Sequence, residues 1–137
     1  MKEKKRVAIT VGDPGGVGPE IVLKSISSPE MEGLCKFVVI GDSSVIEEAM
    51  KLMNLSIDHE AAEFIDMGII KDSLFIRNRP SATNGLASVT YLKKATELAL
   101  NGYVNAIVTA PISKESWKMA GFSWPGHTEM LAELTST

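Results

Sequence analysis

The sequence predicts an α/β protein built on a parallel sheet. Three observations support this fold class. Short runs rich in β-branched residues, such as Arg6–Val11 and Lys36–Ile40, alternate with longer amphipathic stretches. A glycine-rich turn follows the first run and leads directly into one of these stretches. The composition, 45% hydrophobic and 23% charged, is ordinary for one modest globular domain.

The first half of the chain is expected to hold two strands and two helices. A strand over Arg6–Val11 precedes a helix over Glu20–Ser27. A second strand over Lys36–Ile40 precedes a helix that Ser43 or Ser44 caps. This order is typical of strand–helix–strand units in a parallel sheet.

The middle of the chain is expected to contain a strand and the clearest helix. Within a less regular stretch, Ser73–Arg77 is a candidate edge strand, and a polar loop over Pro80–Gly85 follows. Leu86–Leu100 has the strongest helical periodicity in the chain. The apolar face of that helix comprises Val89, Leu92, Ala95, Ala99 and Leu100.

The last third is expected to hold one more strand and two helices. Asn105–Thr109 is the strand, and Ser113–Ala120 is a short helix with Ser113 as its cap. Thr128–Thr137 has the periodicity of a helix beginning, and the sequence then stops, so the chain is expected to be a fragment of a longer protein.

Charge and composition exclude several classes of partner. A net charge of −3 gives no support for binding to nucleic acid or acidic membranes. The apolar run Val7–Val11 is too short to span a bilayer, and no signal-peptide core follows the basic start. Cys35 is the single cysteine, which fits a reducing compartment, and its strand-like surroundings predict a buried thiol. We therefore expect a cytoplasmic protein.

The glycine-rich turn Gly12–Glu20 joins a strand to a helix, where α/β proteins often bind phosphates. It is not a dinucleotide fingerprint, because Ile21 stands where a third glycine would follow Gly16 and Gly18. It is not a Walker A loop, because no lysine follows its glycines. The alternative is a tight turn that needs glycine for its geometry, with Asp13 hydrogen-bonding the turn.

A second candidate site is Gly-His-Thr-Glu at positions 126–129. His127 is a neutral or cationic donor near pH 7, and Thr128 offers a hydroxyl beside free backbone N–H groups at a helix start. This combination suits a small anionic, oxygen-rich substrate. The alternative is that Thr128 caps the helix and His127 packs or lies exposed. Lys114 either contacts a phosphate or carboxylate or lies on an exposed helix face.

Other side chains have simpler explanations. We interpret Trp117, Met119 and Trp124 as packing residues and His59 as solvent-exposed.

Both motifs resemble those of the PdxA family of 4-hydroxythreonine-4-phosphate dehydrogenases. Ile9–Lys24, ITVGDPGGVGPEIVLK, is similar to the start of that family and to the shorter glycine-rich opening of isocitrate and isopropylmalate dehydrogenases. Thr109–Pro111, Lys114 and Gly126–Glu129 are similar to its second motif, about ninety residues further on. The resemblance covers essentially the whole chain, which would be about the first two fifths of the usual family length.

The resemblance implies a three-layer α/β/α fold of the isocitrate/isopropylmalate dehydrogenase type. Residues 1–137 would be the N-terminal part of a two-domain dehydrogenase, ending near the start of the second domain. His127 and Thr128 would bind substrate, with Lys114 as a further candidate, and no catalytic or NAD-binding residue is assigned. NAD and a divalent zinc, magnesium or cobalt ion are implied, with the metal-binding histidines and the main NAD contacts beyond Thr137.

The implied activity of the intact enzyme is NAD-dependent oxidation, with decarboxylation, of 4-phosphohydroxy-L-threonine to 3-amino-2-oxopropyl phosphate in pyridoxal phosphate biosynthesis. A homodimer is implied, and the fragment alone would be inactive. One alternative is a 4-phospho-D-threonate or 4-phospho-D-erythronate dehydrogenase of sugar-acid catabolism. The others are a phosphate-handling acyltransferase of related fold and a non-catalytic binding domain.

Overall fold

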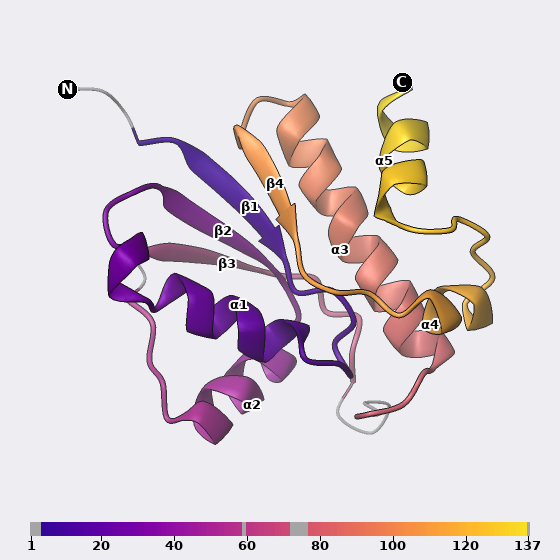
Figure 1. Cartoon of the computed structure of the whole chain (residues 1–137), viewed down its shortest axis with the longest axis horizontal. Helices are drawn as coiled ribbons and strands as arrows, with labels where there is room; N and C mark the ends of the chain where they lie inside the picture. Colours follow the sequence, from indigo (N-terminus) through magenta and orange to yellow (C-terminus); the bar gives the residue numbers. More distant parts are fainter. Residues whose placement is uncertain (1–3, 59, 72–76, 137) are drawn as a thin grey trace.

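The structure, a computed structural model, describes residues 4–58, 60–71 and 77–136. Its centre is a parallel four-stranded sheet in the order β3-β2-β1-β4 (Figure 1). The strands are β1 (Arg6–Thr10), β2 (Lys36–Gly41), β3 (Ala62–Asp66) and β4 (Ala106–Thr109). The α/β prediction with a parallel sheet is therefore confirmed.

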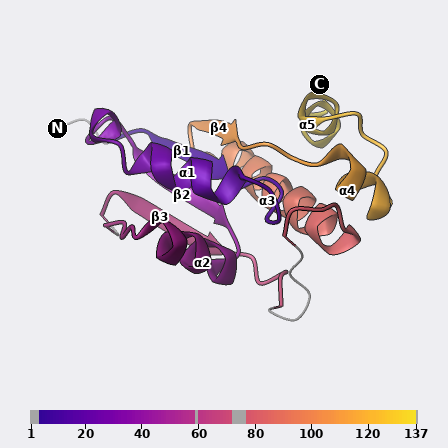
Figure 2. The ribbon, with the colours of Figure 1, turned by 60° about the horizontal axis from the view of Figure 1, so that its bottom comes forward.

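Helices cover both faces of this sheet and complete the three layers (Figure 2). On one face lie α1 (Gly18–Ile26) and α2 (Ser43–Met53), which follow β1 and β2, with a 3-10 turn at Pro29–Met31 between α1 and β2. On the other face, the long helix α3 (Ala82–Leu100) packs against β1, β2 and β4. Two further helices, α4 (Lys114–Met119) and α5 (His127–Thr135), lie against α3.

The order of the strands creates a switch point between β1 and β4. From β1 the chain winds outward through α1 to β2 and through α2 to β3. It then returns along α3 on the opposite face and adds β4 on the other side of β1. In open α/β sheets, ligands bind beyond the carboxyl ends of the strands where the winding direction reverses. The fold thus points to the carboxyl ends of β1 and β4.

Two clusters of buried side chains hold these layers together. The main core lies between the sheet and its helices, and Ala8, Val38, Val39 and Ile40 are fully buried in it, as expected for parallel strands covered on both faces. A smaller group, which we call the C-terminal cluster, consists of Val89, Leu92, Trp117 and Met130. It joins α4 and α5 to α3, so these helices depend on α3 for their position.

The middle of the chain differs from the prediction. The strand β3 over Ala62–Asp66 was not predicted, because it is a short edge strand with only one fully buried side chain and little apolar alternation. The candidate strand Ser73–Arg77 lies outside the described residues except for Arg77, which belongs to no strand.

The start of α3 also corrects the prediction. The loop expected over Pro80–Gly85 ends at Ser81, whose hydroxyl accepts a hydrogen bond from the Asn84 N–H at 3.0 Å and caps the helix. Polar Asn84 and Gly85 suggested a loop, yet both are buried. At the other end, Leu100 was wrongly assigned to the apolar face, since its side chain is 64% exposed.

The ends of the remaining helices give mixed outcomes. Ser113 caps α4 as predicted, accepting from the Ser116 N–H at 3.0 Å. At α2 the cap is Asp42 rather than Ser43 or Ser44. The carboxylate of Asp42 accepts instead from the Ile69 and Ile70 N–H groups, at 2.6 and 3.1 Å, and from the buried Tyr91 hydroxyl.

Several single-residue predictions are also settled. Trp117 is fully buried, and Trp124 packs against the C-terminal cluster, as expected of packing residues. Met119 is 54% exposed, so the packing role predicted for it is wrong. Cys35 is half-buried and packs against the main core, and burial raises its pKa. His59 lies outside the described residues.

Among the helices that are described, none combines the length and apolar character needed to cross a membrane.

Candidate functional site

The glycine-rich turn and the Thr-Ala-Pro turn meet at the switch point. The Ala110 N–H donates to the Thr10 carbonyl, and the Asp13 N–H donates to the Pro111 carbonyl, both at 3.0 Å. Gly12 has φ +73°, and a Cβ atom there would lie 2.2 Å from the Pro111 oxygen. Glycine is therefore required at this position by both conformation and space, and this explains one of the turn's glycines without a ligand.

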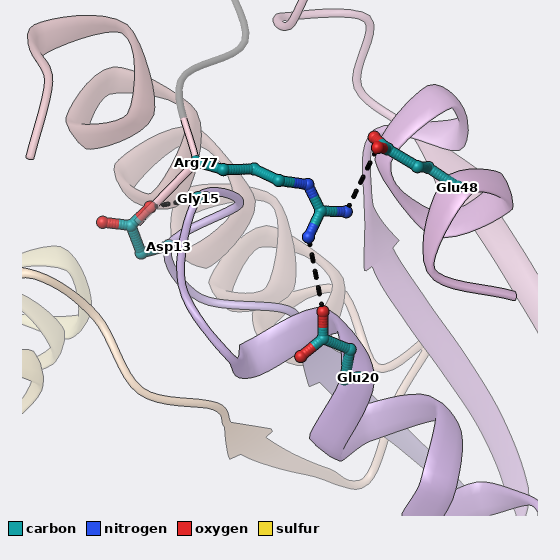
Figure 3. Close-up of polar contacts among 5 residues, drawn as sticks. All are labelled: Asp13, Gly15, Glu20, Glu48 and Arg77. Atoms are coloured by element: carbon teal, nitrogen blue, oxygen red, sulfur yellow. Dashed lines mark hydrogen bonds and ion pairs between the residues drawn. The ribbon is translucent and has the colours of Figure 1, made fainter. Parts of the chain in front are cut away.

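Asp13 is the polar centre of this junction. Its side chain is only 7% exposed, and one carboxylate oxygen, Oδ1, accepts from the Gly15 N–H at 2.7 Å (Figure 3). The other oxygen, Oδ2, accepts from the Ser116 hydroxyl at 3.3 Å. Burial raises the pKa of this carboxyl, while the hydrogen bonds from Gly15 and Ser116 oppose that rise. The expectation that Asp13 hydrogen-bonds its own turn is confirmed.

Ser116 carries the connection into the helical half of the molecule. Its hydroxyl oxygen also accepts from the Ser81 N–H at 3.0 Å, at the start of α3. A Cβ atom on Gly85 would lie 2.0 Å from the Ser116 carbonyl oxygen, so α3 and α4 approach closely at this glycine. The next residue, Trp117, donates its indole N–H to the Ser88 hydroxyl at 2.8 Å. The position of α4 is thus defined by several contacts at once.

Beside the glycine turn, an arginine bridges the two helices on the face of the sheet opposite α3. Arg77 pairs with Glu20 of α1 at 3.6 Å and with Glu48 of α2 at 3.4 Å (Figure 3). The neighbouring Asn78 N–H donates to the Gly15 carbonyl at 2.9 Å. The geometry of the glycine turn does not require an acid at position 20. The ion pair with Arg77 gives Glu20 a structural role beside this turn.

His127 begins α5 and lies beside the C-terminal cluster. Its imidazole meets Trp117 edge-on, with ring centroids 5.9 Å apart and planes at 84°. Burial lowers the pKa of His127, which favours a neutral ring near pH 7. The Nε2 atom is buried and has no hydrogen-bond partner among residues 4–58, 60–71 and 77–136. Such an atom is available to a ligand that reaches it.

The structure also places Thr128 and Lys114 beside this histidine. The N-cap of α5 is Gly126, not Thr128, and Thr128 lies exposed in the first turn. Lys114 is exposed at the start of α4, and its Cε atom is 3.7 Å from where a Cβ on Gly126 would lie. Gly126 itself is extended, at φ −179°, and a Cβ there would make only ordinary contacts. Neither its conformation nor protein packing explains the glycine, which leaves close approach of a ligand as a reason for it.

The three candidate residues, Lys114, His127 and Thr128, thus lie around the start of α5, and we call this candidate group the half-pocket. It offers an ammonium group, an imidazole, a hydroxyl and the free N–H groups of a helix start, which together suit an anionic, oxygen-rich molecule. Within the described part of the chain, no three His, Cys, Asp or Glu side chains gather in a way that would hold a metal ion.

The link from Asp13 to Ser116 was not found from the sequence. Asp13 attracted attention as an acid in a glycine turn, but Ser116 is one serine inside a short helix and carries no motif. The two are 103 positions apart, and only the meeting of β1 and β4 brings them together.

Comparison with known proteins places this geometry in a family. Residues 33–137 match the family described as "Pyridoxal phosphate biosynthetic protein PdxA". The chain is 42% identical to the 4-hydroxythreonine-4-phosphate dehydrogenase of Thermosynechococcus vestitus, covering 96% of this chain and 39% of that protein. It is 38% identical to an Oceanobacillus iheyensis protein assigned as a D-threonate 4-phosphate dehydrogenase, covering 100% of this chain and 45% of that protein.

A solved structure agrees with these relatives. The crystal structure of a 4-hydroxythreonine-4-phosphate dehydrogenase from Burkholderia phymatum superposes with a TM-score of 0.89 at 35% identity. The alignment covers 99% of this chain and 45% of that one. The chain thus spans less than half the length of these relatives. On the family match over residues 33–137 and this shared fold, the chain belongs to the PdxA family.

Proposed function

We propose that this chain is the N-terminal part of a two-domain dehydrogenase that oxidises a small phosphorylated hydroxy acid with NAD. The observation that carries the proposal is that the glycine-rich turn and the Thr-Ala-Pro part of the second motif meet at the switch point of the sheet, where α/β proteins bind ligands. Membership of the PdxA family supports the reaction class, because the relatives carry dehydrogenase names. The protein is proposed to act as a cytoplasmic homodimer.

In this proposal the half-pocket binds the charged end of the substrate. The first-turn N–H groups of α5 and the Lys114 ammonium attract a phosphate or carboxylate. The Thr128 hydroxyl adds a donor and acceptor, and the neutral His127 ring offers its buried Nε2 atom. These contacts hold the substrate in one orientation, which is a large part of catalysis when a hydride must be aligned with its acceptor.

The cofactors would be held by other parts of the intact protein. The described residues gather no metal-binding group of three side chains, and the glycine turn lacks the dinucleotide fingerprint. A zinc, magnesium or cobalt ion and NAD, as family membership implies, are therefore proposed to contact residues outside this chain. When bound, such an ion favours ionisation of a substrate hydroxyl and NAD accepts the hydride.

The proposed substrate is 4-phosphohydroxy-L-threonine, oxidised and decarboxylated to 3-amino-2-oxopropyl phosphate in pyridoxal phosphate biosynthesis. The name of the Thermosynechococcus relative supports this choice. The name of the Oceanobacillus relative supports a second candidate, 4-phospho-D-threonate or its erythronate analogue. Both are small phosphorylated hydroxy acids, and the half-pocket's donors suit either.

An assay of the intact protein tests this proposal. Each phosphorylated acid is supplied with NAD and a divalent metal ion, and NADH formation is followed by its absorbance. The proposal predicts turnover, with a higher kcat/KM for 4-phosphohydroxy-L-threonine. A higher kcat/KM for 4-phospho-D-threonate would overturn the pyridoxine assignment. Turnover of acetyl phosphate without NAD, and no NADH from either acid, would overturn the dehydrogenase proposal in favour of an acyltransferase.

A further inference from the structure

Asp13 is buried at a place where stability does not require a charge. Taking a carboxylate out of water is costly unless it is fully compensated, and the partners described for this one are a backbone N–H and a hydroxyl, both uncharged. A neutral side chain at this position would avoid the desolvation cost. The acid at this position therefore calls for an explanation other than stability.

The contacts of Asp13 connect the two halves of the switch point. Through Oδ1 it fixes the glycine turn at Gly15, and through Oδ2 it holds Ser116 in α4. Ser116 is followed by Trp117, whose indole packs edge-on against His127. A continuous series of contacts thus runs from the end of β1 to the first residue of α5.

We propose that Asp13 is a positioning residue, which sets the glycine turn and the half-pocket of Lys114, His127 and Thr128 at a fixed distance and orientation. The proposal rests on the proposed function, since it assigns the alignment of that same half-pocket to Asp13. It does not make Asp13 a catalytic residue, because it acts on the half-pocket through Ser116 and Trp117.

The directions of the two hydrogen bonds at the Ser116 hydroxyl explain why an acid is needed at position 13. The single hydroxyl proton of Ser116 is donated to Asp13, while the hydroxyl oxygen accepts from the Ser81 N–H. An amide in place of the carboxylate keeps an acceptor for Gly15 but presents an N–H group to Ser116. The Ser116 proton then loses its acceptor, and the link between the glycine turn and α4 is weakened.

The first test compares Asp13→Asn with Asp66→Asn in the intact protein. Asp66 is the control, because it also lies at the carboxyl end of a strand of the sheet and accepts backbone N–H groups, from Ser43 and Gly68, away from α4 and α5. Misplaced substrate lowers kcat steeply, so Asp13→Asn is expected to reduce kcat by about ten- to a hundred-fold with a smaller change in KM. Its melting temperature at pH 7 is expected to stay close to that of the wild type, because the avoided desolvation of the carboxylate offsets the lost Ser116 hydrogen bond. Asp66→Asn is expected to keep the wild-type kcat.

An unchanged kcat in Asp13→Asn, or a reduced kcat accompanied by a lower melting temperature, would overturn the positioning role. Ser116→Ala adds an independent check, because it breaks the same link from the other side. If the two residues act as one unit, the double variant loses no more kcat than the worse single variant. Multiplying losses would contradict the proposal.

A second measurement separates this proposal from the proposed function. NMR spectra of the intact protein report the His127 ring protons and the Trp117 indole N–H without any substrate. Asp13→Asn is expected to shift both sets of signals, and Asp66→Asn is expected to leave them in place. If neither phosphorylated acid is turned over but these shifts occur, the proposed substrate is wrong and the positioning role stands. If turnover occurs and the signals do not move, the positioning role is wrong.

Discussion

His127 and Trp117 face each other edge-on, with ring centroids 5.9 Å apart, and this pair joins a candidate binding residue to the packed interior. Trp117 is fully buried in the C-terminal cluster, whereas His127 stands at the exposed start of α5 with its Nε2 atom buried. The half-pocket is therefore connected to the C-terminal cluster through the contact of His127 with Trp117. Its histidine packs against Trp117 of a buried cluster that α3 supports.

A first prediction concerns the protonation of His127. Burial lowers the pKa of this ring, so its NMR titration midpoint in the folded chain is expected below the value of about 6.5 for a free imidazole. The chain has two histidines, and a His59→Gln variant assigns the signals. A midpoint at or above that of the urea-unfolded chain would contradict the burial seen at His127.

The same shift makes stability depend on pH in a defined window. Between the folded and unfolded pKa values the unfolded chain binds more protons, so the free energy of unfolding rises with pH there. The contribution of His127 is complete above about pH 6.5 and is lost as the pH falls through the window. Urea unfolding at several pH values checks this, because His127→Gln is expected to flatten that part of the pH profile relative to the wild type.

A second prediction concerns the buried hydrogen bond from Tyr91 to Asp42. Tyr91→Phe leaves a carboxylate oxygen of the buried Asp42 without this donor, which is expected to cost about 1–3 kcal/mol in the free energy of unfolding. Tyr103→Phe is the matched control, because the Tyr103 hydroxyl donates to Glu63 at the exposed surface. The control is expected to change stability by no more than about 0.5 kcal/mol. If Tyr91→Phe and Tyr103→Phe lowered the free energy of unfolding in urea equally, the distinction between the buried and the exposed hydrogen bond would be refuted.

A third prediction concerns the close approach of α3 and α4. Alanine is favoured over glycine inside a helix by about 1 kcal/mol, so Gly85→Ala in an open helix would be stabilising. Here the new Cβ would lie 2.0 Å from the Ser116 carbonyl oxygen, and the clash is expected to destabilise the chain by about 1–3 kcal/mol. Gly16→Ala, whose Cβ would meet nothing nearer than 3.5 Å, serves as the control. A thermal melt in which Gly85→Ala equals or exceeds the wild type would contradict the packing.

The sequence was sufficient for the regular parts of this fold. β1, β2 and β4 are apolar runs rich in β-branched residues, which predicts strands of a parallel sheet, and β1 and β2 are largely buried as such strands are. The cap at Ser113 follows from local chemistry, as does the left-handed glycine at Gly121 after α4. These features depend on residues close together in the chain, so short-range patterns predict them.

The rest depends on tertiary contacts that no local pattern contains. Asn84 and Gly85 have the composition of a loop, yet they form the first turn of α3 because Ser81 caps that turn and α4 packs on it. Leu100 fits the helical periodicity but is exposed at the last residue of α3. Ser116 gains its importance only from Asp13, far away in sequence. The candidate site was therefore predicted residue by residue, while its connections were not.

The central claim, that the half-pocket at the start of α5 binds the substrate, is tested most directly by the kinetics of His127→Ala in the intact protein. With a phosphorylated hydroxy acid and NAD, kcat/KM is expected to fall by about a hundred-fold while the melting curve stays cooperative. His59→Ala, which changes the other histidine of the chain, is expected to keep the wild-type kcat/KM. An unchanged kcat/KM in His127→Ala would contradict the claim and leave His127 as a packing residue.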